Sequence, residues 1–517
     1  MTGREPSVAA QVLGWCSRTS DAIAVSQGED RWTYRELGQA VRGVAAELQA
    51  AGVRPGQVVA VTAPRGLALA AAWVAVLLHR GVLLPLDPAL PSAARAGMLT
   101  RAGASVDLLA GNVDTAVHPD VPVLRVGGQP RESSPRVVGP VADPGPVEAG
   151  YVFFTSGSTG VPKAILGRHR SLAAFLTWLR STLGVTPADR IAHLSGPGFD
   201  VSLREVFLPL TSGARLCLPP PGPVPPGAVL PWLTESGVTL VHTVPTVARA
   251  WLRFAPTGVE LPRLRTVLFS GEPLTDTLIT RWRTQLGYQG AIVNQYGPTE
   301  TTLIRCWHPV TTPVPGIQPL GLPIPGSQAW VEDPPGHRAP TGAVGEIVLR
   351  TRYGTSGYLG DAALTAARFT FGPDGEVTYR TGDLGRLDEG GLLHFHGRLD
   401  DQIKIHGVRF HLHGVEAALE AQPGIDQAAV TAEQGPDGPP RLTAHLVLAT
   451  GHDQVPAGLR AALLDHLPAA AVPSRLIAVD ALPHTLASGK LDRPRLTTAP
   501  SAPYGIQPAA WHLKETS

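Results

Sequence analysis

Three of the four lysines in this chain of 517 residues stand inside glycine-containing motifs. They are Lys163, Lys404 and Lys490, whereas Lys514 lies near the end of the chain. The chain contains 43 Lys and Arg residues in all, so arginine carries most of its positive charge. A compact ammonium on a flexible stem suits a point contact with an anion. We therefore interpret the three motif lysines as candidates for chemistry and Lys514 as a solvated residue.

The first motif is FTSGSTGVPKA, residues 154–164, which follows the apolar run that begins at Tyr151. Its hydroxyls and glycines allow backbone N–H groups to approach phosphate oxygens, and Lys163 adds positive charge. It is not a Walker loop, because Lys163 follows Pro162 and no GK[ST] is present. A Ser/Thr/Gly loop alone is more often an ordinary turn, but the Pro-Lys ending after a buried strand favours a phosphate cradle.

The second motif is NQYGPTETT, residues 294–302. Tyr296 could stack on a flat base while Glu300 holds a magnesium ion, a hard cation that prefers carboxylate and phosphate oxygens. The alternative is a turn that leads into a helix, with Thr299 as its cap.

Three further motifs follow: YRTGDLGR at 379–386, GRLDDQIKIHG at 397–407 and LPHTLASGKLDR at 482–493. Asp383 on a glycine-bounded turn could accept both hydroxyls of a ribose, and Arg398 could reach the same sugar from a neighbouring strand. Either residue could equally lie on the surface. Lys490 is presented from a glycine turn, which alone is weak support for a role in catalysis.

The segments that must position these motifs alternate between strand and helix patterns, which is typical of α/β folds. A 12-residue apolar run at 67–78 is too short to span a bilayer and predicts a buried helix. The proline-rich stretch 219–226 predicts a surface loop. From about residue 400 a second region begins, with a strand pattern at 441–448 and a helix pattern at 455–467. Other helices are expected at 34–51, 172–183 and 415–421, and other strands at 58–62, 152–155, 239–244, 266–270 and 346–350.

Composition narrows the function class. The length predicts two to four domains or subdomains, and a net charge of +1 gives no indication of nucleic acid or an anionic membrane as partner. Cys16, Cys217 and Cys306 have no CxxC spacing, which argues against a disulfide framework or a zinc site and favours the cytoplasm. The N-terminus lacks the apolar core of a signal peptide.

Taken in order and at these intervals, the five motifs resemble the adenylate-forming superfamily of acyl-CoA synthetases and luciferases and, most closely, amino-acid adenylation domains of nonribosomal peptide synthetases. The resemblance begins at WTYRELG, residues 32–38, continues through GVLLPLDP at 81–88, and covers nearly the whole chain. It implies an α/β fold with a large N-terminal core of α/β subdomains, residues 1–399. A small mobile α+β C-terminal domain, residues 400–517, would act as a lid that carries Lys490 and turns about a hinge at Asp400.

The resemblance also implies a reaction. A carboxylate attacks the α-phosphorus of Mg-ATP to give an acyl-adenylate and pyrophosphate, and a thiol then takes the acyl group. Such catalysis rests on positioning and electrostatic stabilisation rather than on a protein nucleophile. The implied catalytic residues are Lys490, Glu300, Thr155 and Lys404, with Glu300 as the magnesium ligand. The implied ATP-binding residues are Thr155, Ser156, Gly157, Ser158, Thr159, Gly160, Lys163, Gly271, Glu272, Asn294, Tyr296, Thr299, Asp383 and Arg398.

The acyl group is indicated by FDVSLREVF, residues 199–207. Asp200 resembles the family's anchor for the α-ammonium of an amino acid, and its alternative role is to cap a helix that begins at Val201. The side-chain pocket, by position, consists of Val201, Arg204, His242, Leu268, Ser270, Gln295, Leu303 and Ile304.

Burying the Arg204 guanidinium among apolar neighbours costs free energy unless an anion or a strong hydrogen-bond acceptor contacts it. The adjacent Glu205 is not expected to be that partner, because neighbouring residues on a helix point in different directions. This leaves the ligand and predicts an acidic α-amino acid. The alternative is that Arg204 swings outward and that the pocket takes a neutral or aromatic substrate.

The chain departs from the family at His406 and His411, where Arg and Glu are common. This puts the geometry of the thioester step in question. No carrier-protein motif follows Arg493, so the chain resembles either a free-standing adenylation protein or a part of a larger synthetase. If it is complete, we expect a separate phosphopantetheinylated carrier protein as acceptor. Many relatives also need an MbtH-like protein. Two rival functions are a coenzyme A ligase for an aryl or alkyl acid and a catalytically silent, adenylate-binding scaffold.

Overall fold

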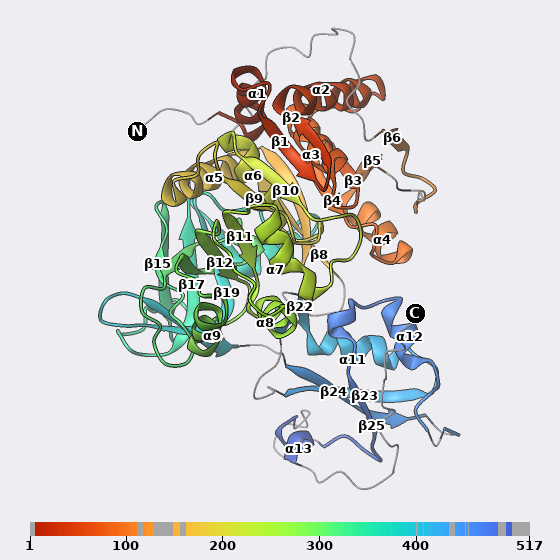
Figure 1. Cartoon of the computed structure of the whole chain (residues 1–517). Helices are drawn as coiled ribbons and strands as arrows, with labels where there is room; N and C mark the ends of the chain where they lie inside the picture. The colour runs from red at the N-terminus through yellow and green to blue at the C-terminus, as the bar shows by residue number, and fades with distance from the viewer. Residues whose placement is uncertain are drawn as a thin grey trace.

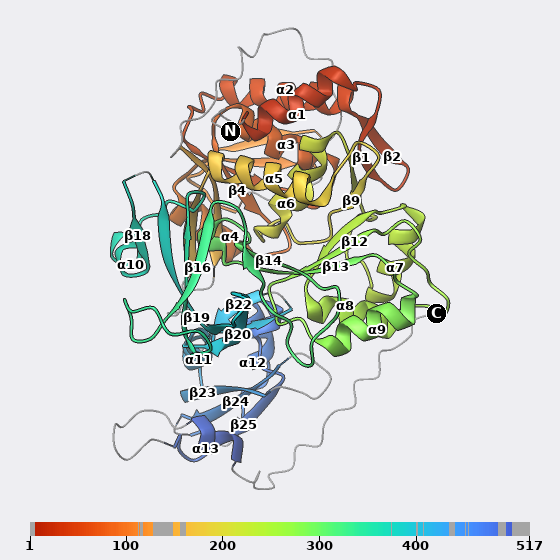
Figure 2. The ribbon, with the colours of Figure 1, turned by 90° about the vertical axis from the view of Figure 1, so that its left-hand side faces the viewer.

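A computed structural model describes residues 6–111, 113, 117–127, 148–155, 162–373, 375–399, 402–406, 408–433, 440–449, 451–452, 454–483 and 493–498. The large N-terminal part is built from sheets flanked by helices, and a small C-terminal part lies below it in both views (Figures 1 and 2). This arrangement confirms the predicted fold class.

The first sheet of the N-terminal part is parallel except for its last pair of strands. In spatial order it consists of β6 (Val123–Val126), β5 (Ala104–Ala110), β3 (Val58–Thr62), β4 (Val82–Leu86), β7 (Ala149–Thr155) and β8 (Lys163–Arg168). The helices of this region are α1 (Val8–Arg18), α2 (Tyr34–Ala50), α3 (Leu67–Leu78) and α4 (Ser92–Ala102). Of these, α3 packs against β3, β4 and β5, and α4 packs against β5. Helix α3 is buried from Leu69 to Leu78, as its apolar sequence predicts.

The second sheet is the larger one and holds most of the predicted pocket. In spatial order it consists of β15 (Leu322–Pro323), β14 (Cys306–Pro309), β13 (Ala291–Tyr296), β12 (Thr266–Ser270), β11 (Leu240–Thr243), β9 (Arg190–Ala192), β10 (Arg215–Leu218), β1 (Ile23–Gln27) and β2 (Asp30–Thr33). The strands from β13 to β1 are parallel. Parallel strands are usually covered on both faces, which explains their apolar sequences.

The helices that follow in this region are α5 (His169–Leu183), α6 (Val201–Ser212), α7 (Pro226–Glu235), α8 (Pro245–Phe254) and α9 (Asp276–Leu286), with the 3₁₀ turn η1 (Thr299–Thr301) after β13. Pro226 is the first residue of α7, so the predicted proline-rich loop ends one residue earlier than expected. Proline suits this position because a first-turn N–H has no partner within the helix.

A third, antiparallel sheet follows, in which β20 pairs with β19. Its elements are β16 (Ser327–Glu332), β17 (Gly345–Thr351), α10 (Ala362–Arg368), β18 (Phe369–Phe371), β19 (Val377–Leu387) and β20 (Leu393–Arg398).

The C-terminal part has a hydrophobic core of its own, which includes Phe410, Val415, Leu419, Val430 and Leu446. Its elements are β21 (Gln402–Ile405), β22 (Val408–His411), α11 (Leu412–Glu420), β23 (Ile425–Glu433), β24 (Arg441–Leu448), α12 (Leu459–Leu464), η2 (Ala469–Ala471), β25 (Arg475–Ala478) and α13 (Arg493–Thr498). Asp400 and Asp401, at the predicted boundary, lie outside the described residues, so the position of that boundary stays a prediction. In the ranges described, no helix combines the length and the hydropathy needed to cross a membrane.

Candidate functional site

The predicted pocket lies at the carboxyl ends of three neighbouring parallel strands. His242 on β11 pairs with Leu268 on β12, and Ser270 at the end of β12 pairs with Gln295 on β13. Ligands of open α/β sheets bind outside the carboxyl ends of the strands. The fold thus brings together residues that the sequence places on separate strands.

Arg204 reaches this strand edge from α6. One terminal nitrogen of its guanidinium donates to Oε1 of Gln295 at 2.7 Å, and the other donates to Oγ of Ser270 at 2.8 Å. The side chain is only 1% exposed, so it does not swing outward. The sequence-based expectation that only a ligand could meet Arg204 is wrong, because two neutral protein acceptors across the sheet edge do so.

Several polar atoms of this cluster have no hydrogen-bond partner among the described residues. They are Nε of Arg204, Nε2 of Gln295 and both ring nitrogens of His242. Burial lowers the pKa of Arg204 to about 10, with Asp200 and Glu205 opposing the shift, so the guanidinium stays protonated near neutral pH. Burial and the charge of Arg204 lower the pKa of His242, which is therefore neutral. Buried polar atoms of this kind need an explanation, and a polar ligand group provides one.

Asp200 stands immediately before α6, but its side chain makes no capping hydrogen bond. The alternative role of Asp200 as a helix cap is therefore wrong. Its charge acts instead on the pKa values of Arg204 and of the buried Tyr151 hydroxyl. The carboxylate therefore lies close enough to Arg204 and Tyr151 to influence both, and it makes no hydrogen bond to the N-terminus of α6.

Three of the residues predicted to hold the nucleoside, Tyr296, Asp383 and Arg398, contact one another across β13, β19 and β20. The Tyr296 hydroxyl donates to Asp383 at 2.6 Å, and Arg398 makes an ion pair with the same carboxylate. Asp383 and Arg398 are direct partners in the strand register, as the prediction of neighbouring strands requires. Asn294 is buried on β13, and its amide donates to the Pro319 carbonyl at 2.8 Å.

Glu300 lies in η1 and is 1% exposed. Its Oε1 accepts a hydrogen bond of 3.2 Å from the Tyr358 hydroxyl, and its backbone carbonyl accepts one of 2.6 Å from Thr355. Thr299 is the first residue of η1 rather than its cap, so the alternative reading of this motif, with Thr299 as a helix cap, is wrong.

Lys163 begins β8 and pairs in register with Thr155 at the end of β7. Its ammonium lies 5.8 Å from the centre of the Tyr358 ring, on the aromatic side chain that also contacts Glu300. The fold therefore brings the lysine of the first motif close to the carboxylate of the second. A cation over an aromatic face is held electrostatically.

The remaining predicted residues occupy the surrounding walls. Leu268, Leu303 and Ile304 are buried, and Val201 is the first residue of α6. Gly271 has a φ of 88°, which glycine adopts without strain. The Glu272 carboxylate accepts from the Thr246 backbone N–H at 2.9 Å, so it also caps α8.

Some predicted residues cannot be placed. Ser156, Gly157, Ser158, Thr159 and Gly160 lie outside the described residues, as do Asp400 and Lys490. Lys404 lies on β21 opposite Arg409, and its side chain also lies outside the described part.

Sequence reasoning missed Tyr151, Tyr358 and Arg305, each of which contacts or adjoins the site. Tyr358 stands between glycines in SGYLG, which was a detectable signal. Arg305 interrupts the run LIRCW directly after the second motif, where a charge was unexpected.

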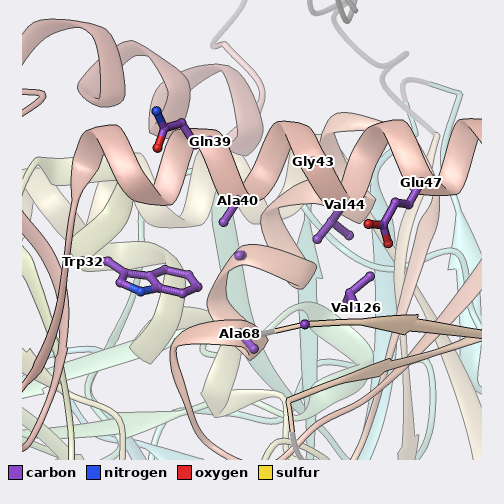
Figure 3. A pocket seen from close by; sticks show the side chains of 10 residues that line it. Trp32, Gln39, Ala40, Gly43, Val44, Glu47, Ala68 and Val126 are labelled. Atoms are coloured by element: carbon purple, nitrogen blue, oxygen red, sulfur yellow. The ribbon is translucent and has the colours of Figure 1, made fainter. Parts of the chain in front are cut away.

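A separate hollow lies between β2, α2, α3 and β6, away from the candidate site (Figure 3). None of the predicted site residues lines it. Its labelled lining residues include Trp32, Ala40, Val44, Ala68 and Val126.

Comparison with known proteins agrees with the motif order. Residues 13–359 match the family described as AMP-binding enzyme, and residues 414–490 match the AMP-binding enzyme C-terminal domain. The chain is 37% identical over 498 residues to phosphinothricin tripeptide synthetase PhsC of Streptomyces viridochromogenes. The aligned region covers 93% of this chain and 44% of that protein. The chain spans less than half the length of the curated relatives that it matches, from 6% to 44%.

Two solved structures are also similar. One is holo-PA1221, a nonribosomal peptide synthetase protein containing adenylation and PCP domains bound to a vinylsulfonamide inhibitor, with a TM-score of 0.81, 28% identity and coverage of 95% of this chain and 84% of that one. The other is the amide bond synthetase McbA of Marinactinospora thermotolerans, with a TM-score of 0.79, 25% identity and coverage of 95% and 99%. The chain therefore belongs to the AMP-binding enzyme family of adenylate-forming ligases, with relatives among the nonribosomal peptide synthetases.

Proposed function

We propose that this enzyme activates an α-amino acid as aminoacyl-AMP, releases pyrophosphate, and passes the aminoacyl group to the phosphopantetheine thiol of a separate carrier protein. The observation that carries the proposal is the Asp200 carboxylate, which stands at the start of α6 without capping it and acts electrostatically on Arg204 in the pocket. An ammonium that leaves water needs such a partner.

The ATP side of the proposal uses the residues around η1 and β19. Asp383 would accept the ribose hydroxyls with Arg398 and Tyr296 holding its orientation, and Lys163 would meet phosphate oxygens. No group of three or more His, Cys, Asp or Glu side chains gathers as a metal site in the described ranges, so Glu300 would hold Mg²⁺ together with the phosphates. Mg²⁺ is commonly coordinated by one carboxylate together with phosphate oxygens of the substrate. The bound ion would neutralise the negative charge that develops on the phosphates during the reaction.

The C-terminal part completes the proposal. Lys490 would bridge the substrate carboxylate and the α-phosphate, within a lid domain that begins at the proposed boundary of residues 399 and 400. Lys404, on β21, is a further proposed catalytic residue of this part. An MbtH-like protein is a further proposed partner, and a reducing cytoplasm suits the three buried free thiols of Cys16, Cys217 and Cys306.

The substrate class that we propose is an acidic α-amino acid. Asp200 would balance its α-ammonium and Arg204 its side-chain carboxylate, so that each buried charge has a counter-charge. Gln295 and Ser270 give Arg204 neutral acceptors but no counter-charge. Nε of Arg204 and Nε2 of Gln295, which have no hydrogen-bond partner within the described residues, could each donate to a substrate carboxylate.

Pyrophosphate exchange with wild type and Arg204→Leu tests this substrate class. Aspartate, glutamate and 2-aminoadipate are compared with their amides and with apolar isosteres. We expect the wild type to prefer an acidic substrate and Arg204→Leu to lose at least a hundredfold on it while losing far less on the isosteres. A wild type that ignores every acidic substrate, or an unchanged preference in the variant, contradicts the acidic assignment.

The second candidate function is a coenzyme A ligase for an aryl or alkyl acid. A solved amide bond synthetase is among the similar structures, and its name indicates no carrier protein as acceptor, so coenzyme A is tested as an acceptor as well. The discriminating assay asks whether coenzyme A accepts the acyl group and whether activation needs Asp200. Transfer to coenzyme A that survives Asp200→Asn would favour the ligase.

A further inference from the structure

Arg305 lies buried directly behind the segment that carries Glu300. It is 1% exposed and is one of the largest fully buried side chains of the described chain. Its Nε donates to the Thr301 carbonyl at 2.5 Å, and one terminal nitrogen donates to the carbonyls of Thr302 at 2.9 Å and Tyr353 at 2.7 Å. All three acceptors are backbone atoms, and they belong to two different segments.

The segment 297–304 needs such support because its backbone is strained. Thr302 has a φ of 68° and Leu303 a φ of 63°, the left-handed region that side chains with a Cβ rarely adopt. Such a backbone conformation costs free energy, and it persists only where the surrounding structure holds it. Thr302 is the first of the two strained residues. Arg305 donates to the carbonyl that precedes it, that of Thr301, and to the carbonyl of Thr302 itself.

The segment is also folded tightly on itself. A Cβ on Gly297 would lie 2.5 Å from Cα of Ile304, and the Arg305 N–H closes the loop by donating to the Tyr296 carbonyl at 2.7 Å. The Tyr151 hydroxyl donates to Oγ1 of Thr302 at 3.2 Å on a further side. Movement of any one residue here would displace the others.

The same loop carries two parts of the site. Glu300 lies near its middle, and the buried pocket residues Leu303 and Ile304 lie at its end. The second segment held by Arg305 includes Tyr353, two residues before Thr355, which donates to the Glu300 carbonyl at 2.6 Å. Removing a charged group from water to bind only carbonyls is costly, which favours a positioning role over a gain in stability alone.

We propose that Arg305 is a positioning residue that locks residues 297–304, and that it thereby sets the Glu300 carboxylate and the Leu303–Ile304 pocket wall together. The inference rests on the proposed function, since it takes Glu300 as the magnesium ligand and Leu303 and Ile304 as substrate contacts. Its consequence is that the magnesium requirement and the amino-acid selectivity depend on one side chain that touches neither ligand.

Arg305→Lys tests this role, because lysine keeps the charge but cannot donate from a planar fork to three carbonyls. Hydrogen–deuterium exchange of the backbone at 297–305 is measured without any ligand, and pyrophosphate exchange is measured over Mg²⁺ and amino-acid concentrations. We expect exchange at 297–305 to accelerate at least tenfold. The Mg²⁺ concentration for half-maximal activity and the KM for the amino acid should each rise at least fivefold, with weaker discrimination between substrates.

Arg265→Lys is the matched control. Arg265 also donates to a backbone carbonyl, that of Leu183 at 2.7 Å, and it forms an ion pair with Asp189. None of these three residues belongs to the segment 297–304. The Arg265→Lys variant should lower the Tm without changing the Mg²⁺ requirement or exchange at 297–305. An Arg305→Lys enzyme that behaves in the same way would overturn the proposal.

If Arg305→Lys does not fold, the double variant with Thr302→Gly provides the second test. Glycine adopts a positive φ without strain, so the loop should then need Arg305 less and folding should return. Failure of the double variant to fold would make Arg305 a residue of overall stability and contradict the positioning role.

Glu300→Gln separates this inference from the proposed function. An unchanged Mg²⁺ requirement in Glu300→Gln would refute the metal assignment, whereas the ligand-free exchange rates of Arg305→Lys would still report on loop positioning. A changed requirement in Glu300→Gln with wild-type exchange in Arg305→Lys would refute only the positioning role.

Discussion

The Tyr358 hydroxyl donates a hydrogen bond of 3.2 Å to Oε1 of Glu300, across a separation of 58 residues in the chain. The same ring lies 5.8 Å from the Lys163 ammonium. One aromatic side chain thus stands between the proposed phosphate lysine and the proposed metal ligand, and it fixes one oxygen of the carboxylate. The hydroxyl thereby helps to orient the Glu300 carboxylate toward the metal ion that we propose it holds.

Tyr358→Phe is expected to raise the Mg²⁺ concentration for half-maximal pyrophosphate exchange by roughly fivefold, because one net hydrogen bond is worth about 1 kcal/mol. The ring, and with it the contact to Lys163, remains in place. The KM for ATP at saturating Mg²⁺ should therefore change less than twofold. A variant with a wild-type Mg²⁺ profile would show that the hydroxyl does not orient Glu300 for the metal.

Asp200→Asn should abolish amino-acid activation without lowering the Tm, because asparagine is neutral and the Asp200 side chain does not cap α6. Asp361 provides the contrasting case, since its side chain accepts from the Leu364 N–H at 2.9 Å and caps α10. Asp361→Ala should cost about 1 kcal/mol of stability and leave the activation rate unchanged. Normal activation by Asp200→Asn would remove the main support for an amino-acid substrate.

Elements that consist of one unbroken apolar run could be predicted from the sequence. The bounds of α3 (Leu67–Leu78), β3 (Val58–Thr62) and β12 (Thr266–Ser270) agree with the expected ones. The helix expected at 455–467 is confined to Leu459–Leu464, because Gly458 before it is left-handed, with a φ of 87°. Glycine can adopt this conformation freely, and the hydrophobic pattern does not reveal it.

The site was predictable where chemistry is local and not where it depends on contacts across the fold. Motif spacing indicated Asp383 with Arg398, which are register partners on adjacent strands. The partners of Arg204 lie 91 and 66 residues away, at Gln295 and Ser270, and nothing in the local sequence indicates those pairings. Tertiary packing supplies these acceptors, so the sequence can indicate that Arg204 carries a buried charge but not which groups accept its hydrogen bonds.

Lys490→Ala should lower pyrophosphate exchange a few hundredfold, since removal of one preorganised electrostatic donor costs roughly 3 kcal/mol in the transition state. Transfer from a presynthesised aminoacyl-adenylate to the carrier protein should be affected much less. Lys514→Ala is the control for loss of a lysine near the chain end. Equal exchange rates in the two variants would mean that Lys490 is not the catalytic lysine.

The last prediction concerns Glu205, which lies fully buried beside Arg204 in the sequence and accepts from the backbone N–H and the hydroxyl of Ser195 at 3.0 and 3.1 Å. Burial raises the pKa of this carboxyl from 4.5 to about 7, against the opposing effects of Ser195, Arg204 and Arg65. Between these two pH values the folded protein keeps a proton that the unfolded chain has lost. The free energy of unfolding therefore falls as the pH rises through this window and levels off above it.

Glu205→Gln removes this titration while keeping an amide that can accept from and donate to Ser195. The nearby His193 has its pKa lowered to about 3 by burial, and it is present in both proteins, so its effect cancels in the comparison. Chemical denaturation from pH 5 to pH 8 should show the stability of wild type falling relative to Glu205→Gln by about 1–3 kcal/mol as the pH rises. Parallel stability curves for the two proteins would show that Glu205 titrates at its ordinary pKa.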